Sequence, residues 1–200
     1  MRLGRILPRP FYARHAVEVA RGLLGKVLVH GAVAGRIVET EAYLGGDDLA
    51  AHSARGLTDR TRVIFGPPGH AYVYLIYGMY ECLNLVADAK GVPGCVLIRA
   101  LEPVEGIELM QARRPAARKL RQLADGPGKL TRAMGITRAH NGRDVTRGDL
   151  VVREPEAGAA FEIAVTPRIG ITQSADLPLR FVIAGSEFAS ARRYNGASPK

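Results

Sequence analysis

The chain has 200 residues, the size of one domain and long enough to bury a core without disulfides or metal ions. Its 28 Lys and Arg against 19 Asp and Glu give a formal net charge of +9, which favours a polyanionic partner such as nucleic acid; a merely well-solvated, highly charged protein is the alternative. No apolar run reaches the length of a membrane span, the N-terminus lacks a signal-peptide core, and Cys82 and Cys95 predict neither a disulfide framework nor a zinc site, so we expect a cytoplasmic protein without a metal.

The first part of the chain predicts a helix followed by strands. Apolar residues recur at helical spacing over residues 14–24, and Gly25 offers a left-handed stop. A short strand over residues 27–29 follows, and residues 36–43 alternate as a longer strand. Asp47 or Asp48 is then expected to cap a short helix that carries His52.

After a polar loop over residues 55–69, two apolar runs at 71–76 and 81–86 predict a β-hairpin. Its turn carries Tyr77 and Met79, whereas hairpin tips are normally Asn, Asp, Gly or Ser. The remaining expected elements are a strand at 95–101, a helix at 105–114, a helix that opens at 126, and strands at 161–165 and 179–184.

No internal repeat and no long linker divides the chain. We therefore predict a single α+β domain over residues 1–200, built on a curved antiparallel or mixed sheet with surrounding helices and a protruding hairpin. Residues 1–10 and 190–200 are expected to be flexible ends.

The strand at 36–43 carries the first candidate chemistry. Glu39, Glu41 and Tyr43 share one face, at spacings of about 6 to 7 Å. If that face is inward, an ionised Glu41 needs a partner, and a general base for water would justify its burial; a solvated strand face is the alternative. Arg99 interrupts an apolar run and must find a carboxylate, so it predicts either a structural pair with Glu39 or Glu41 or a clamp on a water molecule.

Aromatic residues provide the second set of candidate functional residues. His52 suits a stacking or hydrogen-bonding wall, although a structural histidine would show the same pattern, and Tyr72 and Tyr74 share one strand face, as core tyrosines would. Tyr77 at a hairpin tip in a basic protein indicates a wedge between base pairs. Lys129, near the start of the helix that opens at 126, could bind one backbone phosphate, although the spacing of a nucleotide-binding P-loop is absent.

Four motifs in order carry a family resemblance. They are RIVETEAY at 36–43, AAHS at 50–53, YVYLIYGMY at 72–80 and VLIRALEP at 96–103. Together they resemble the alkyladenine (3-methyladenine) DNA glycosylases. The resemblance implies a monofunctional base-excision repair enzyme without cofactor, which flips a damaged purine out of double-stranded DNA, hydrolyses its N-glycosidic bond and leaves an abasic site. We also expect the protein to be a monomer. The lesions it implies are 3-methyladenine, 7-methylguanine, hypoxanthine and ethenoadenine.

The resemblance also implies roles for particular residues. Glu41 would activate water, with Arg99 and the main-chain carbonyl of Ile169 fixing that water. The flipped base would lie among Tyr43, His52, Tyr74, Leu97 and Asn84, of which Asn84 would clash with the amino group of normal guanine. Tyr77 and Met79 would fill the vacated place in the stack, and the phosphate contacts would fall on Arg114, Lys129 and Arg138.

Two other functions fit single features of the sequence. A non-enzymatic nucleic-acid-binding module would use the aromatic residues for stacking and the Glu/Arg pair for structure, and it would keep every activity in a Glu41→Gln variant. A metal-dependent hydrolase would instead use Glu39, Glu41 and His52, and a chelator would abolish its turnover.

Overall fold

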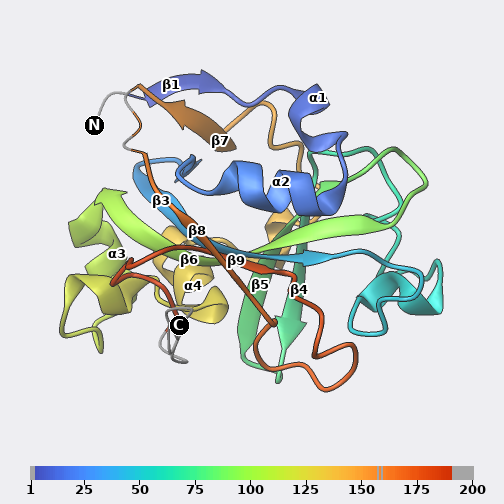
Figure 1. Cartoon of the computed structure of the whole chain (residues 1–200). Coiled ribbons are helices and arrows are strands. Elements are labelled where there is room, and N and C mark those ends of the chain that lie inside the picture. The colour runs from blue at the N-terminus through green and yellow to red at the C-terminus, as the bar shows by residue number, and fades with distance from the viewer. Residues whose placement is uncertain (1–2, 157, 159, 191–200) are drawn as a thin grey trace.

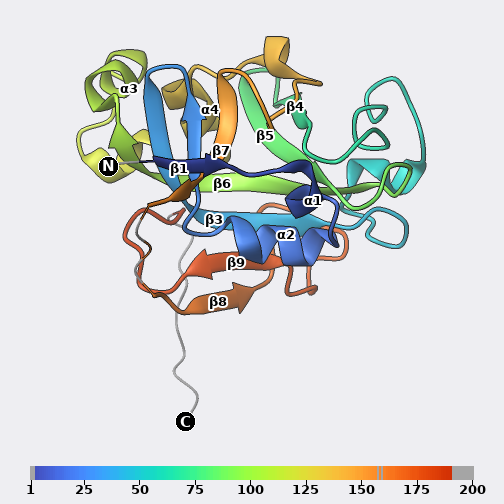
Figure 2. The ribbon, with the colours of Figure 1, turned by 90° about the horizontal axis from the view of Figure 1, so that it is seen from above.

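Nine strands form one open sheet in the computed structural model, which describes residues 3–156, 158 and 160–190 (Figure 1). The strands are β1 (Leu3–Ile6), β2 (Val27–His30), β3 (Val33–Tyr43), β4 (Ala71–Ile76), β5 (Tyr80–Ala87), β6 (Gly94–Glu105), β7 (Leu150–Pro155), β8 (Ile163–Thr166) and β9 (Arg180–Ile183). Their order is β1-β7-β2-β3-β6-β5-β4, and β9 pairs with β3 and β8 (Figure 2). Each pairing in the described chain is antiparallel, so the expected α+β domain is confirmed.

Short helices pack on this sheet. The α-helices are α1 (Arg9–Tyr12), α2 (Ala16–Leu23), α3 (Ile107–Arg113) and α4 (Pro127–Met134), and the 3-10 helices are η1 (His52–Arg55), η2 (Leu120–Leu123) and η3 (Arg138–His140). Helix α2 buries an apolar stripe against β3 and β6 and ends before Gly25, whose φ of 78° is left-handed. Helix α4 packs on β5 and β6. The helix expected at 14–24 is thus confirmed with shorter bounds.

Strand β3 runs through the centre of the sheet and is buried on both faces. Thr40 faces α2, where its hydroxyl donates to the carbonyl of Ala20 over 2.9 Å. Glu39 and Glu41 are both 0% exposed, so the solvated strand face considered from the sequence is wrong. The two carboxylates therefore need partners from within the protein.

Two irregularities in the β3–β6 ladder bring a partner, Arg99, to the Glu39 and Glu41 carboxylates. Ile37 pairs with Leu101 and Glu39 with Ala100, so one extra residue, Val38, lies on β3. Further on, Glu39 pairs with Ala100 and Thr40 with Ile98, so the extra residue is Arg99 on β6. Bulges bend a strand and re-aim side chains. Arg99 is consequently directed at the carboxylates of the neighbouring strand.

The β4–β5 hairpin extends to the lower edge of the view in Figure 1. Tyr77 and Gly78 at the centre of its turn have φ of 52° and 69°, as a type I′ turn requires, and the Met79 amide donates to the Ile76 carbonyl over 3.2 Å. Tyr77 is 78% exposed and Met79 68% exposed. The hairpin with a bulky, solvent-facing tip is therefore confirmed.

Three expectations about other segments need revision. Residues 3–6, expected in a flexible end, form β1 and pair with β7, a strand that the sequence pattern did not indicate. Asp48 does not cap η1: the residue before that helix is Ala51, and no side chain caps it. The Asp48 carboxylate accepts instead from the amides of Leu44 and Ala50. The expected C-terminal end falls, beyond Ser190, outside the described residues.

Candidate active site

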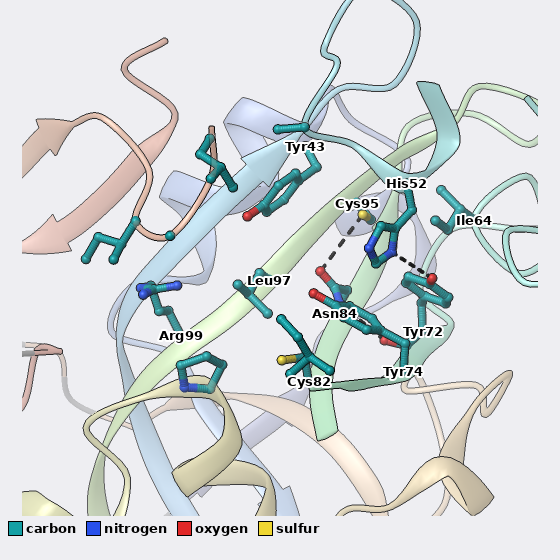
Figure 3. Close-up of a pocket in the computed structure, with 16 residues that line it drawn as sticks. Tyr43, His52, Ile64, Tyr72, Tyr74, Cys82, Asn84, Cys95, Leu97 and Arg99 are labelled. Atoms are coloured by element: carbon teal, nitrogen blue, oxygen red, sulfur yellow. Dashed lines mark hydrogen bonds between the residues drawn. The ribbon is translucent and has the colours of Figure 1, made fainter. Parts of the chain in front are cut away.

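A cavity of ≈ 230 Å³ opens between β3, β6 and the β4–β5 hairpin. It brings together seven residues singled out in the sequence: Tyr43, His52, Tyr74, Asn84, Leu97, Arg99 and Ile169. Figure 3 shows Tyr43 on one side and the His52 and Tyr74 rings on the other, with Asn84 between them and Leu97 below Tyr43. The lining residues that sequence reasoning did not single out are Ala50, Ile64, Tyr72, Ile76, Cys82, Cys95, Pro127, Gly170 and Ile171.

Glu41 does not itself line this cavity, but three residues that do line it hold the Glu41 carboxylate as donors. The amide of Ile169 donates to Glu41 Oε1 over 2.8 Å, and the Tyr43 hydroxyl donates to Oε2 over 3.0 Å. Arg99 Nη1 donates to the same Oε2 over 3.4 Å. The carboxylate is thus fixed from both sides, and the donors come from β3, β6 and the loop after β8.

Burial raises the pKa of Glu41 above its ordinary value, although Arg99, the Ile169 amide and the Tyr43 hydroxyl each act to lower it. A carboxyl group in this environment is a stronger base, once ionised, than one in water. The same burial raises the pKa of Tyr43 well above its usual range, so the phenol keeps the proton that it donates to Glu41.

Arg99 also reaches the second buried carboxylate. Its Nε lies 3.3 Å from Glu39 Oε1, so one guanidinium bridges Glu39 and Glu41. Glu39 is fully engaged by other donors as well: Arg180 Nε lies 2.5 Å away, and the Ser190 amide and hydroxyl donate over 2.6 and 2.8 Å. With those contacts Glu39 is a structural anchor for Arg99, whereas Glu41 is the carboxylate next to the cavity.

The aromatic wall has a defined protonation state. Arg60 Nη2 lies 3.3 Å from His52 Nε2, and a guanidinium only donates, so Nε2 accepts and Nδ1 carries the proton that faces the Tyr72 hydroxyl at 2.9 Å. Burial, reinforced by Arg60, lowers the pKa of His52 to about 4. The ring is therefore neutral at physiological pH, and its centroid lies 4.5 Å from that of Tyr74 in an edge-on arrangement.

Asn84 lies in the cavity wall, in contact with Tyr72 and Cys95. The Asn84 amide donates to the Tyr72 carbonyl over 3.4 Å, and Cys95 Sγ lies 4.0 Å from Asn84 Oδ1 (Figure 3). Burial raises the pKa of Cys95 to about 12, so this thiol stays neutral. The cavity is thus lined by aromatic rings and apolar side chains, with the Asn84 amide and the neutral His52 imidazole as polar groups on its wall and the Arg99 guanidinium at the Glu41 end.

The comparisons with known proteins agree with this arrangement. Residues 10–187 match the family described as Methylpurine-DNA glycosylase (MPG). The chain belongs to this family. A protein from Methanocella arvoryzae is 56% identical over 180 residues, which cover 88% of this chain and 89% of the relative. A protein from Methanoculleus marisnigri is 54% identical over 93% of this chain and 99% of its own, and one from Koribacter versatilis is 52% identical over 94% of both; all three carry the name "Putative 3-methyladenine DNA glycosylase".

Membership makes the chain a DNA glycosylase with a DNA substrate, which disfavours the non-enzymatic binding module. The metal-dependent hydrolase also fails on geometry, because Glu39, Glu41 and His52 do not converge: Glu39 contacts Arg180 and Ser190, while His52 contacts Tyr72 and Arg60. Among the described residues, no group of three or more His, Cys, Asp or Glu side chains is arranged as metal ligands.

The remaining sequence-derived residues of the glycosylase lie outside the cavity. Tyr77 and Met79 form the hairpin tip. Lys129 on α4 contacts Asp125 over 2.6 Å. On η3, the main-chain amide of Arg138 donates to the Glu81 carboxylate, and the Arg138 side chain is 66% exposed. Arg114 follows α3 and is half-buried. No helix in the described part of the chain is both long and apolar enough to cross a bilayer.

Sequence reasoning missed two arginines that organise the site. Arg180 on β9 pairs with Glu39, and Arg168 pairs with Asp48 across 120 residues. Periodicity carries no signal for either pair, because each joins strands or loops that meet only in the folded sheet. The one available sign was the presence of single arginines within otherwise apolar segments, the sign that identified Arg99.

Proposed function

We propose that this glycosylase excises alkylated and deaminated purines from double-stranded DNA by direct hydrolysis of the N-glycosidic bond, with Glu41 as general base. The observation that carries the proposal is a fully buried carboxylate with a raised pKa, held by three donors at the edge of an aromatic cavity. Ionised Glu41 takes a proton from water while the water oxygen bonds to the anomeric carbon. The glycosidic electron pair leaves with the purine, and an abasic site remains.

Arg99 has a second function in this proposal. With its guanidinium on Glu39 and Glu41, it is positioned to orient the attacking water, together with the main-chain carbonyl of Ile169. The amide of Ile169 already donates to Glu41, so the same residue would hold the base through its nitrogen and the water through its oxygen. Such fixed donors and acceptors lower the reorganisation needed during reaction.

The cavity suits a flipped purine that stacks between Tyr43 and the His52–Tyr74 pair. Alkylation at N3 or N7 leaves positive charge on the base, which the π-faces attract and which improves the leaving group. Neutral lesions such as hypoxanthine and ethenoadenine gain only stacking, so for them water positioning carries more of the acceleration. Asn84 in the cavity wall would reject the exocyclic amino group of guanine by a clash.

Outside the cavity, Tyr77 and Met79 would occupy the gap that the flipped nucleotide leaves, while Arg114, Lys129 and Arg138 would contact phosphates. Because a single chain supplies every residue in this proposal, we propose that the enzyme acts as a monomer. We further propose that it acts in the cytoplasm and without a cofactor.

The test is single-turnover release of free base from a duplex with one hypoxanthine or ethenoadenine, with EDTA present throughout. Glu41→Gln removes the base but keeps the size of the side chain, so lesion-DNA binding should persist while the rate falls by about 10²- to 10⁴-fold. Glu102→Gln is the matched control, because Glu102 pairs with Arg36 and does not line the cavity.

Near-normal release by Glu41→Gln would remove Glu41 from the role of base. Release that requires a metal, and so stops in EDTA, would refute hydrolysis by the carboxylate alone. If the wild type releases neither base, the same assay with 3-methyladenine in methylated DNA decides whether the proposed lesion range is wrong or only too broad.

A further inference from the structure

A buried ion pair next to the cavity has no part in the chemistry proposed above. Arg168 Nη1 lies 2.6 Å from Asp48 Oδ2 and Nη2 lies 2.7 Å from Oδ1, a bidentate contact. The side chains are 0% and 1% exposed. Burying two charges costs several kcal/mol per ion, and an apolar pair of similar size is often as stable, so stability alone is a weak reason for the pair.

The pair joins two loops. Asp48, in the loop after β3, accepts from the amides of Leu44 and Ala50 over 3.1 and 3.3 Å. Arg168, in the loop after β8, donates to the carbonyls of Ala42 and Ser174 over 3.0 and 3.3 Å. Asp48 thus contacts the backbone near its own loop, and Arg168 contacts both the end of β3 and the backbone of its own loop. These contacts hold the two loops in a fixed relative position.

Two groups that hold Glu41 depend directly on Arg168. Ile169, the next residue, supplies the amide on Glu41 Oε1. The guanidinium also lies over the ring of Tyr43, with Cζ 4.6 Å from the ring centroid, and the hydroxyl of that ring donates to Glu41 Oε2. Arg168 does not line the cavity, so it acts on the ring of Tyr43 from outside.

We propose that Asp48 and Arg168 are positioning residues for Glu41, because together they fix the Ile169 amide and the Tyr43 phenol that orient its carboxylate. This inference rests on the proposed function of Glu41. The pair has no contact with the reacting atoms, and its effect passes entirely through these two neutral donors. A shift of about 1 Å in a reacting group is enough to cost about 100-fold in rate.

The inference has a signature in the pH dependence. The charged and titratable groups facing Glu41 are Arg99, Glu39 and Tyr43, with the Cys82 thiol and Arg168 next to them. The Ile169 amide and Tyr43 hydroxyl both lower the pKa of Glu41, so loosening them raises that pKa further. The acid limb of the pH–rate profile should then move to higher pH.

Two variants test the pair with different effects on folding. Arg168→Lys keeps a cation for Asp48 but loses the bidentate contact and the planar group over Tyr43. The double variant Arg168→Met with Asp48→Asn leaves no unpaired charge in the interior. Both should show single-turnover excision about 10- to 100-fold slower than the wild type, an acid limb at higher pH, and lesion-DNA Kd within about threefold.

Asp144→Asn is the control, because it breaks an ion pair with Arg9 that does not line the cavity. It should lower Tm without moving the pH profile. Excision at the wild-type rate with an unshifted acid limb, in either folded Arg168 variant, would overturn the inference. Failure of the proposed function is distinguishable, since then either the wild type itself releases no base or Glu41→Gln releases it at a near-normal rate.

Discussion

Replacement of Tyr77 is expected to weaken DNA binding while it leaves folding almost unchanged. Its backbone adopts φ of 52°, a left-handed conformation that costs a non-glycine residue about 1–2 kcal/mol, and its ring is 78% exposed. Tyr77→Gly removes that cost, while the added freedom of glycine in the unfolded chain opposes it by about 0.5–1 kcal/mol. The two effects nearly cancel, so Tm should stay within about 2–4 °C of the wild type.

DNA binding should respond differently. If the ring fills the gap left by a flipped base, its loss removes stacking of about 1–3 kcal/mol, or roughly 5- to 150-fold in affinity for lesion duplex. Single-stranded lesion DNA leaves no such gap, so excision from it should change little. Val165→Ala, an exposed apolar residue on β8, is the control and should leave both substrates unaffected.

Fluorescence-anisotropy titration of lesion duplex, thermal unfolding and excision from both substrates measure these quantities. Unchanged duplex affinity in a Tyr77→Gly variant of normal Tm would refute the wedge. A fall in Tm of the size expected for a buried tyrosine would instead refute the reasoning about the hairpin.

Three further outcomes are expected. Because the folded pKa of Glu41 is raised, its contribution to stability is present below its unfolded pKa of about 4.3 and is lost as pH rises through the folded value. The Tm of Glu41→Gln minus the Tm of the wild type should therefore increase as pH rises from ~4 to neutral. A constant Tm difference across that range would contradict a raised pKa of Glu41. Asn84→Ala should begin to release undamaged guanine, measured by chromatography of the freed bases; no gain over background would exclude the clash. Arg138→Ala should weaken damaged and undamaged duplex alike and reduce the slope of log K against log[salt] by about 1, whereas a loss confined to lesion DNA would not fit a phosphate contact.

Local patterns predicted the elements that pack by their own periodicity. Residues 36–43 and the paired runs at 71–76 and 81–86 became β3, β4 and β5, because alternation and turn residues determine strands over short distances. Strands β1 and β7 were not predicted from the sequence, and they pair with each other across about 150 residues of sequence. Such distant pairing leaves no signal in a local pattern.

The site shows the same division. Arg99 was detectable as a charge within an apolar run, and Glu41 through the strand face that it shares with Glu39 and Tyr43. Which carboxylate Arg99 would contact was not detectable, since the bulge at Arg99 decides it and the guanidinium contacts both. The resemblance implied that the main-chain carbonyl of Ile169 fixes the attacking water. The structure adds that the main-chain amide of Ile169 donates to Glu41, which no sequence pattern indicates. The role of Asp48 was misjudged because a capping residue and a buried ion-pair partner look alike in sequence.

The order in which the chain is synthesised has a consequence for this enzyme. Glu41 emerges early, but the amide that holds it comes 128 residues later, and the Ser190 groups on Glu39 come 151 residues after that carboxylate. Domains fold as units during synthesis, and contacts between distant residues form late. A nascent chain therefore has its β4–β5 hairpin well before Glu41 has its amide donor, so under the proposed mechanism unfinished copies that reach DNA would be unable to excise a base.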